Sequence, residues 1–458
     1  MKKIKSKTAY LCSSCGDDFS KWFGQCPSCK EWDTLSSFKV KTKNKIRKLG
    51  DRRSKPLKDL LVIKQDERIS TNIKEVDRVL GGGLLHGSFI LLGGSPGVGK
   101  STLALHMCSD IKQLCLYISA EESEQQVALR AKRIGIKTDN LHLSGENDLD
   151  AIITEIDYLK PQLVVIDSIQ TIMNFELDSL PGSPSQIRDC GQKLLEVCKQ
   201  NNIAILIVGH ITKEGNIAGP KMLEHMVDTV LYLEGENRYD HRILRSIKNR
   251  FGATFEVGIF SMGEKGMAEV KNPSEMFLEE RSLNIPGACI YPSLEGTRPI
   301  LVEVQALVSK SSLNIPQRSA NGFDYKRMNI ILAVLDKRMG LSMANKDVFI
   351  NLVGGLKIDD PAADLSILCT IASSSLDKAI KNNLVILGEV GLGGEVRSVN
   401  NLHHRIAESS KLGFKEAIFP KSNINKKIEK LDIISHPVKN VKEAFQIILN
   451  KNYKRDVK

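Results

Sequence analysis

The sequence has 458 residues, of which 41% are hydrophobic and 26% charged, and its formal net charge is +11. This length suggests about three domains. No run of 18 or more apolar residues occurs and no apolar segment follows the basic first residues. The composition therefore excludes a membrane-spanning protein and favours a cytoplasmic one.

Two C-x-x-C pairs lie near the N-terminus and predict a metal site. The four residues are Cys12, Cys15, Cys26 and Cys29. Four thiolates in two such pairs suit tetrahedral Zn²⁺, whereas a redox dithiol would need only one pair. We expect Trp22, Phe23 and Trp32 to cover the metal, because so small a module cannot fold on apolar burial alone.

A basic segment follows this module. Residues 39–58 contain ten Lys or Arg and one Asp, which accounts for +9 of the net charge. Such a block indicates an interaction tail for polyanions, and the alternative is a solvated linker without a partner.

The segment Gly94-Ser95-Pro96-Gly97-Val98-Gly99-Lys100-Ser101 fits the phosphate-binding P-loop pattern G-x-x-x-x-G-K-[ST]. An apolar run over 88–93 predicts a buried strand before it, and 102–108 predicts a helix after it. In this order, glycine backbone amides and the helix N-terminus surround phosphate oxygens. We expect Lys100 to reach the β- and γ-phosphates of ATP and Ser101 to bind Mg²⁺, with Thr102 as the weaker candidate.

Three further apolar runs, over 114–119, 163–168 and 203–209, predict strands that end in polar residues. The first leads to Glu121 and Glu122, the second contains Asp167 at its end, and the third leads to His210. Asp167 fits the acidic residue that holds Mg²⁺, usually through water. Alternation of these strands with helices predicts a parallel sheet with its site at the carboxyl ends of the strands. Two long polar loops, 174–185 and 212–221, follow strands at this same edge.

A third domain is expected from about residue 280. Alternating or apolar runs predict strands over 301–308, 347–352 and 384–390. Helices are predicted over 327–337 and 364–378.

The four-cysteine module, the P-loop domain and the stretch Lys248-Asn249-Arg250-Phe251-Gly252 together resemble the RadA (Sms) family of bacterial DNA repair proteins over essentially the whole chain. The central domain is also similar to RecA and to the DnaB helicase motor. The resemblance implies an ATP-driven ring, expected to be hexameric. It further implies single-stranded and branched DNA as substrates, branch migration as the activity and a RecA-type recombinase as a partner.

Individual roles follow where residues match the RecA-type pattern. Glu121 occupies the position of the carboxylate that activates water, with Glu122 as the neighbouring alternative. His210 occupies the position of a γ-phosphate sensor, although a polar strand end without chemistry remains open. Strand alternation puts Lys248 and Arg250 on one side, and the resemblance implies that they reach the γ-phosphate of a neighbouring subunit. Surface cations or direct DNA contacts are the alternative for this pair.

The C-terminal region resembles the proteolytic domain of Lon, but with a departure. Ala362 stands at the position of the nucleophilic serine and His403 at that of the lysine. Since alanine has no hydroxyl, covalent catalysis is impossible there. We therefore expect an inactive scaffold for ring assembly and DNA contact.

These observations predict an α/β protein with four parts: a four-cysteine zinc module over 1–35, a basic linker over 36–59, a RecA-like ATPase domain with a mainly parallel sheet over 60–278, and an α+β Lon-protease-like domain over 279–458. The expected function is a DNA-dependent ATPase and helicase-like motor that needs ATP, Mg²⁺ and Zn²⁺. A non-motor ATP-binding scaffold and an ATP-dependent protease are the alternatives. The zinc module and basic linker argue against the scaffold, and the missing Ser–Lys pair argues against the protease.

Overall fold

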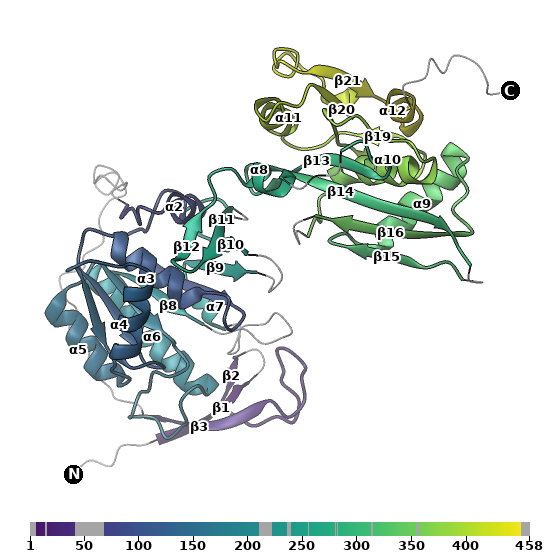
Figure 1. The fold of residues 1–458 in the computed structure, drawn as a ribbon. Coiled ribbons are helices and arrows are strands. Elements are labelled where there is room, and N and C mark those ends of the chain that lie inside the picture. Colours follow the sequence, from purple (N-terminus) through teal and green to yellow (C-terminus); the bar gives the residue numbers. More distant parts are fainter. Residues whose placement is uncertain are drawn as a thin grey trace, which may run out of the picture. The chain divides into compact units, whose positions relative to one another are not determined.

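The computed structural model describes residues 6–13, 16–41, 68–209, 222–235, 240–254, 256–279, 281, 283–312, 315–353 and 357–449. The chain divides into two compact units, Met1–Glu269 and Val270–Lys458 (Figure 1). The four-part division expected from the sequence stays a prediction. Among the helices that the structure describes, none combines the length and the hydrophobicity that a membrane span needs.

The N-terminal module is a small antiparallel sheet with strand order β2-β1-β3. Leu11, Cys12 and Cys26 are buried, but Trp22 and Trp32 are 55% and 69% exposed. Phe23, the third aromatic residue expected to cover the metal, is also exposed, and both tryptophan rings lie beside Gly24. The strands are β1 (Ser6–Cys12), β2 (Asp18–Phe19) and β3 (Leu35–Lys41).

A nine-stranded sheet forms the core of the first unit, in the order β12-β11-β10-β9-β4-β8-β7-β5-β6. Its six strands from β9 to β6 are parallel, and β10, β11 and β12 continue the sheet in antiparallel fashion. The central strands are buried along their whole length, as expected for parallel strands covered on both faces. The strands are β4 (Phe89–Gly94), β5 (Cys115–Ser119), β6 (Leu141–Ser144), β7 (Leu163–Asp167), β8 (Ala204–Val208), β9 (Thr229–Glu234), β10 (His241–Asn249), β11 (Val257–Gly263) and β12 (Gly266–Glu269).

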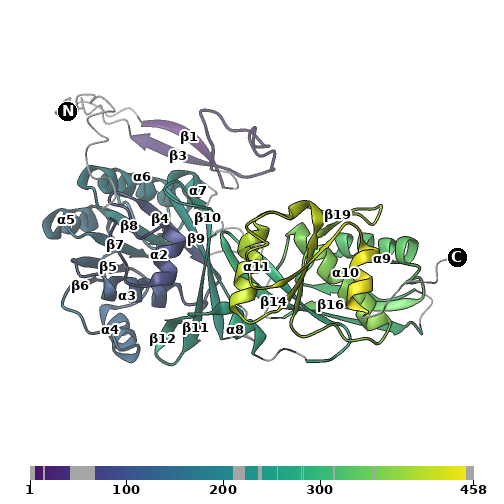
Figure 2. The ribbon, with the colours of Figure 1, turned by 90° about the horizontal axis from the view of Figure 1, so that it is seen from above.

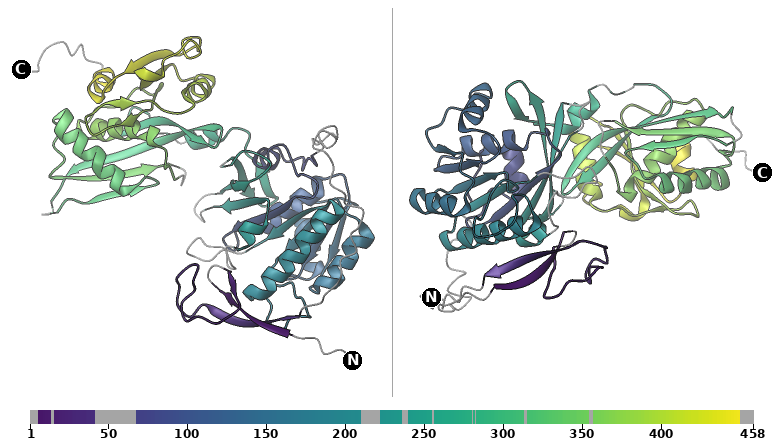
Figure 3. Two further views of the ribbon diagram at one scale, coloured as in Figure 1. Left: turned by 180° about the vertical axis from the view of Figure 1, so that it is seen from behind. Right: turned by 90° about the horizontal axis from the view of Figure 1, so that it is seen from below.

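Helices cover both faces of this sheet and bury two separate apolar layers (Figure 2). The layer with α2, α3 and α4 includes Ile90 and Leu92 of β4, and the layer with α5, α6 and α7 includes Phe89 and Leu91. The alternation along β4 follows from the period of two of a strand. The view from behind in Figure 3 shows the long α6 lying along its face. The helices are α2 (Lys74–Leu80), α3 (Lys100–Asp110), α4 (Glu124–Arg133), α5 (Leu149–Leu159), α6 (Pro184–Asn201) and α7 (Met222–Met226).

The second unit is built on a seven-stranded mixed sheet with the order β15-β16-β14-β13-β17-β20-β21, beside a separate pair β18-β19. The long antiparallel strands β13, β14 and β16 form one half, and the parallel strands β17, β20 and β21 form the other. The strands are β13 (Ala288–Glu295), β14 (Arg298–Lys310), β15 (Arg318–Asn321), β16 (Lys346–Leu352), β17 (Leu384–Ile386), β18 (Glu389–Val390), β19 (Val396–Arg397), β20 (Glu416–Pro420) and β21 (Ile434–Val438).

Helix α10 is buried in the centre of this unit and contacts β13, β14 and α9. It follows a short 3₁₀ turn, Pro361–Ala363, that contains Ala362. The remaining helices are α8 (Pro273–Leu278), α9 (Tyr325–Met339), α10 (Asp364–Ser375), α11 (Leu402–Lys411) and α12 (Val441–Ile448), with a second 3₁₀ turn at Lys421–Asn423.

The strand predicted over 384–390 is wrong in one respect, because the chain forms two strands there in two different sheets. The amide of Leu387 still bonds to Ile418 of β20, but the amide of Gly388 donates to the carbonyl of Ala362. A side chain at Gly388 would collide with Val396. This glycine therefore lets the backbone leave the sheet toward the 3₁₀ turn.

Candidate functional site

The P-loop connects β4 to α3, as the sequence predicts for a phosphate cradle. Gly94, Gly97 and Gly99 have φ angles of 157°, 74° and 111°, which L side chains rarely adopt. Ser95, Pro96 and Gly97 are exposed while Val98 is buried. The loop is thus anchored at Val98 and open to solvent at its tip, where a phosphate chain would enter.

Lys100 is the first residue of α3 and is only 4% exposed. Its Nζ donates to the carbonyls of Gly94 at 2.8 Å and Ser95 at 3.0 Å. Burial lowers the pKa of Lys100, and the nearby carboxylates of Asp167 and Glu121 oppose this shift. Among the described residues, the hydrogen-bond partners of this buried ammonium are two loop carbonyls, and such a cation fits a site that an anionic phosphate chain would complete.

Asp167 lies at the carboxyl end of β7 and is 7% exposed. The hydroxyl of Tyr117 on β5 donates to its Oδ2 at 2.5 Å. Burial, and next the charge of Asp167, raise the pKa of Tyr117 well above its usual value, so this hydroxyl remains a donor. The structure thus holds the Asp167 carboxylate beside Lys100, with the hydroxyls of Ser101 and Thr102 on the first turn of α3.

Two adjacent carboxylates follow β5, and the structure distinguishes them. Glu121 accepts a hydrogen bond from Ser168 at 2.6 Å, and its charge acts on Lys100. Glu122 instead pairs with Arg130 of α4. Ser168 directly follows Asp167 in the sequence and is fully buried. Glu121 is therefore hydrogen-bonded to the residue next to Asp167, and this bond connects the two acidic residues of the site.

The segment from Lys248 to Gly252 lies at the opposite end of β4 from the P-loop. Asn249 pairs with Thr229, the first residue of β9, and the amide of Arg250 donates to the carbonyl of Asp228. The amide of Asp228 in turn donates to the carbonyl of Phe89, the first residue of β4.

The two cations of this segment have partners within the chain. Lys248 Nζ donates to the carbonyls of Glu224 at 2.6 Å and Val227 at 2.8 Å. Burial first, and then Arg250, lower the pKa of Lys248. Arg250 lies 3.7 Å from the Asp228 carboxylate, which also binds Lys199 at 2.6 Å. Arg250 remains exposed, so its guanidinium can reach beyond this ion pair.

The candidate metal ligands of the N-terminal module converge. The sulfur atoms of Cys12, Cys26 and Cys29 lie within 4.8 Å of one another, and Cys12 Sγ lies 3.6 Å from Cys29 Sγ. Zn–S bonds of about 2.3 Å in a tetrahedron put sulfurs about 3.8 Å apart, so these thiols fit zinc. Cys15, like His210, lies outside the described residues.

The backbone repeats itself around the two cysteine pairs. The amide of Cys12 donates to Asp17 and its carbonyl accepts from Gly16; the amide of Cys26 donates to Glu31 and its carbonyl accepts from Lys30. Gly16 and Lys30, each four residues after the first cysteine, both have positive φ angles, 79° and 61°. Two equivalent turns of this kind are typical of a zinc ribbon with two cysteine pairs.

Comparisons with known proteins agree with this geometry. Residues 10–37 match the family model described as a rubredoxin metal binding domain, and residues 52–216 match the AAA domain. The DNA repair protein RadA of Halalkalibacterium halodurans is 45% identical over 455 residues, covering 98% of this chain and all of the relative. RadA of Bacillus subtilis is 46% identical over 456 residues, covering 97% and 99% of the two chains.

The chain belongs to the RadA family of DNA repair proteins. The expected family and the α/β class with a zinc module and a RecA-like core are thus confirmed. The crystal structure of the RadB recombinase matches with a TM-score of 0.37 and 22% identity, covering 44% of this chain and all of that one. This match is too partial to add to the RadA assignment.

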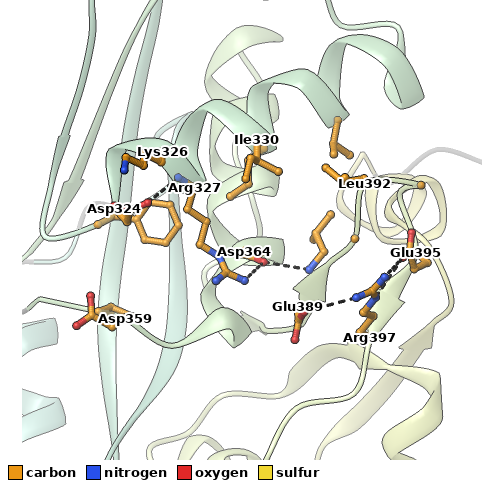
Figure 4. Close-up of a pocket in the computed structure, with 17 residues that line it drawn as sticks. Asp324, Lys326, Arg327, Ile330, Asp359, Asp364, Glu389, Leu392, Glu395 and Arg397 are labelled. Carbon is orange, nitrogen blue, oxygen red and sulfur yellow. Dashed lines mark hydrogen bonds and ion pairs between the residues drawn. The ribbon is translucent and has the colours of Figure 1, made fainter.

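The C-terminal unit of this RadA protein matches, over residues 323–423, the family model described as subunit ChlI of Mg-chelatase. One of its cavities, of about 600 Å³, lies between α9 and the β18–β19 pair (Figure 4). Arg327 binds Asp364 through two hydrogen bonds of 2.5 and 2.7 Å, and Arg397 points toward Glu389 and Glu395. Among the described residues that line this cavity, none carries a hydroxyl or thiol, so it offers no serine-type or cysteine-type nucleophile.

The segments that carry Ala362 and His403 are tied together by a buried polar network. Arg405 is 2% exposed and donates to Asp360 at 2.5 Å, to the Tyr291 hydroxyl at 3.0 Å and to the Pro292 carbonyl at 2.9 Å. Asp360 also accepts from the amide of Ala362. Packing and hydrogen bonding therefore hold this region in place without a Ser–Lys pair.

Three residues with a part in the site were missed from the sequence: Tyr117, Ser168 and Asp228. Ser168 could have been found because it directly follows Asp167. No local pattern marks the others, since each acts across strands that are distant in the sequence.

Proposed function

We propose that this RadA protein is a DNA-dependent ATPase of recombinational repair that binds single-stranded and branched DNA and uses ATP hydrolysis to drive branch migration. The observation that carries the proposal is the convergence of Lys100, Asp167 and Glu121 at the carboxyl edge of the parallel sheet. Parallel sheets bind nucleotides at this edge.

Nucleotide binding would use the loop from Gly94 to Thr102. Its amides and the N-terminus of α3 attract phosphate oxygens. Lys100 would exchange its two carbonyl partners for the β- and γ-phosphates. Ser101 and Asp167 would hold Mg²⁺, which neutralises phosphate charge when bound. Their hydroxyl and carboxylate oxygens are ligands that Mg²⁺ prefers.

Glu121 is the better candidate for the general base. Its carboxylate is oriented by Ser168, whereas that of Glu122 is paired with Arg130. In the proposed step, a water oxygen attacks the γ-phosphorus while the bond to the β-phosphate oxygen breaks. The water proton passes to Glu121, and ADP and inorganic phosphate leave.

Lys248 and Arg250 are too far from the P-loop to serve the nucleotide of their own subunit. Arg250 is hydrogen-bonded next to the start of β4, and the P-loop begins at Gly94, five residues later. At about 3.3 Å per residue, this distance is roughly 17 Å. The position supports a role in trans, in which the two cations act on the γ-phosphate of the next subunit.

A role in trans requires a head-to-tail assembly, and closure of such an assembly gives a ring. We propose a hexamer on the basis of the family resemblance. The C-terminal unit, held together by the Arg405 network, would serve as an inactive scaffold of this ring.

DNA contacts are proposed for the basic linker over 39–58 and for the two loops after the parallel strands. The loop over 174–185 is anchored because Gln186 accepts from the amide of Asn174 and donates to the carbonyls of Asn174 and Ser179. It exposes Phe175 and Leu180. An aromatic side chain on an anchored loop suits stacking against unpaired bases. The second loop, 212–221, and the proposed sensor His210 lie outside the described residues.

Zinc would be held by Cys12, Cys15, Cys26 and Cys29 and would supply folding energy to the module. A RecA-type recombinase is the proposed protein partner, and this rests on the family resemblance.

The decisive experiment compares ATP hydrolysis by the full chain with and without a single-stranded oligonucleotide. We expect stimulation in wild type and loss of turnover in Lys100→Ala, whose fold is checked by circular dichroism. Turnover that DNA does not change would favour a non-motor scaffold, and cleavage of casein would favour a protease.

A further inference from the structure

An arginine from a distant strand contacts the P-loop. Arg242, near the start of β10, donates from Nε to the carbonyl oxygen of Val98 at 3.2 Å. Its Nη1 donates to the carbonyl of His241 at 2.8 Å, which fixes the guanidinium relative to its own strand. The contact joins residues that are 144 positions apart in the sequence.

Because of the geometry of the peptide bond, this contact also sets the direction of the Gly99 N–H. In a trans peptide, the carbonyl of one residue and the N–H of the next point in opposite directions. When Arg242 holds the Val98 carbonyl outward, the N–H of Gly99 faces into the loop. Gly99 has a φ of 111° and immediately precedes Lys100, so this N–H lies where the phosphate chain would bind.

The β11–β12 hairpin encloses the same peptide. Met262 and Met267 form a cross-strand pair, and a β-carbon at Gly99 would overlap with the methyl groups of both. The peptide between Val98 and Gly99 is therefore confined by packing as well as by the hydrogen bond.

Space for the arginine is provided by a glycine. Gly235 follows the end of β9, and a β-carbon there would overlap with Cδ of Arg242 and lie 2.8 Å from its Nε. Gly235 does not have a positive φ. A side chain at this position would thus displace the Arg242 side chain without straining the backbone.

We propose that Arg242 is a positioning residue of the nucleotide site, which aims the Gly99 amide at the phosphates by holding the Val98 carbonyl. The inference rests on the proposed ATPase function and deepens it. Arg242 does not itself contact the nucleotide in this role. Its removal weakens the preformed cradle and leaves the groups of the hydrolysis step, such as Glu121, unchanged.

The test measures KM and kcat for ATP, and Kd for ADP, with the full chain. We expect Arg242→Gln to raise KM for ATP and Kd for ADP about tenfold, the effect of one hydrogen bond to a charged group. We expect kcat to change less than about threefold. Arg242→Lys, which keeps one cationic donor, should recover part of the affinity.

Two further variants test whether the rise in KM comes from the position of the Arg242 side chain, and not from loss of its charge or from general damage to the fold. Gly235→Ala retains Arg242 but displaces it, and should reproduce the rise in KM. Arg245→Gln is the matched control, because Arg245 is on the same strand, three residues on, and lies 3.6 Å from the Glu234 carboxylate. Its KM should equal that of wild type.

The outcomes distinguish this inference from the proposed function. A wild-type protein that does not hydrolyse ATP removes the proposed function, and the ADP affinities then still decide the role of Arg242. Unchanged KM and Kd in both Arg242→Gln and Gly235→Ala overturn the inference, as does a loss of kcat at constant KM. If Arg242→Gln fails to fold, Arg242→Lys and Gly235→Ala carry the decision.

Discussion

The guanidinium of Arg130 pairs with the carboxylate of Glu122, while the adjacent Glu121 accepts from Ser168. The ion pair occupies the Glu122 carboxylate, whereas the neutral Ser168 hydroxyl orients that of Glu121. This contrast within one dipeptide provides a matched pair of substitutions.

We predict that Glu121→Gln lowers kcat for ATP hydrolysis by about 10²–10⁴-fold, the usual contribution of a general base. ATP binding should persist, because the P-loop is unchanged. Glu122→Gln should stay within a few-fold of wild type. Steady-state turnover and nucleotide binding of both variants provide the check, and equal losses in the two would contradict the choice of Glu121 as the base.

Zinc should be present at one ion per chain and should depend on the two cysteine pairs. Cys26→Ser should lose the metal and unfold the N-terminal module only, because metal binding supplies its stability. Cys198→Ala is the control: Cys198 is buried in α6 and belongs to no cluster of possible metal ligands among the described residues. Elemental analysis and limited proteolysis measure both effects, and zinc-free wild-type protein would refute the site.

Mixing of subunits should reveal the role of Lys248 and Arg250. We expect Arg250→Ala protein to bind ATP and assemble, yet to lower the activity of added wild type by more than its mole fraction. A cation supplied in trans is worth roughly 10³–10⁵ in rate. Lys248→Ala should behave alike, with its fold verified because two carbonyls lose their donor. Arg245→Ala, whose side chain pairs with Glu234, is the control, and a decrease in strict proportion to dilution would contradict the trans role.

The basic linker should set much of the salt dependence of DNA binding. Each phosphate contact contributes about 0.7 to the slope of log K against log salt on single strands. Replacing residues 39–58 by a Gly/Ser segment of equal length should flatten this slope while preserving the tether. Fluorescence anisotropy at several salt concentrations measures it, and an unchanged slope would identify the segment as a linker only.

The Arg405–Asp360 pair should stabilise the C-terminal unit above about pH 4. Burial raises the pKa of Asp360, but the charge of Arg405 and the donors Ala362, Tyr291 and Arg405 outweigh it, so the pKa lies below its usual value. A carboxyl whose pKa is lowered on folding stabilises the fold above its unfolded pKa of about 4 and loses this effect as the pH falls through the folded value.

Arg405→Met should therefore cost about 3 kcal/mol at neutral pH, the low end for a buried pair, because the half-buried Asp360 is left charged without its partner. The free energy of unfolding of the Arg405→Met variant should increase rather than decrease as the pH falls. Arg397→Ala, which breaks an exposed pair with Glu395, should leave the stability close to that of wild type, because water screens exposed ion pairs. Hydrogen exchange of β13 and α11 amides in the full chain measures these differences. If the stability of Arg405→Met depends on pH in the same way as that of wild type, the Arg405–Asp360 pair is not the cause of this dependence.

Local patterns in the sequence predicted the elements on which the site is built. The P-loop strand and helix and the strands ending near Glu121 and Asp167 depend on short-range spacing, so their predicted bounds agree with the structure to within two residues. The break after Ile386 was missed because Gly388 leaves the sheet for a partner, Ala362, that is distant in the sequence.

Relationships across the sheet could not be predicted in this way. Alternation predicted Lys248 and Arg250 on one side, but β10 ends at Asn249 and its pairing with β9 shifts register between Ser246 and Lys248. Only the strand order shows that this end of β10 adjoins the start of β4. The contact of Arg242 with Val98 likewise depends on the antiparallel pairing of β9 and β10. Trp22, Phe23 and Trp32 were expected to cover the metal, and all three are exposed in the structure.

Strand β10 fixes the distance between the contacts of Arg242 and Lys248, which a flexible loop could not do. β10 has Arg242 against the P-loop and, six residues later, Lys248 at the opposite edge of the sheet, a span of about 20 Å. Insertions in the turns at either end change neither contact. A one-residue insertion or deletion inside β10 would move one end out of place and turn every following side chain to the other face. Length variation among related sequences should therefore be found beside this strand and not within it.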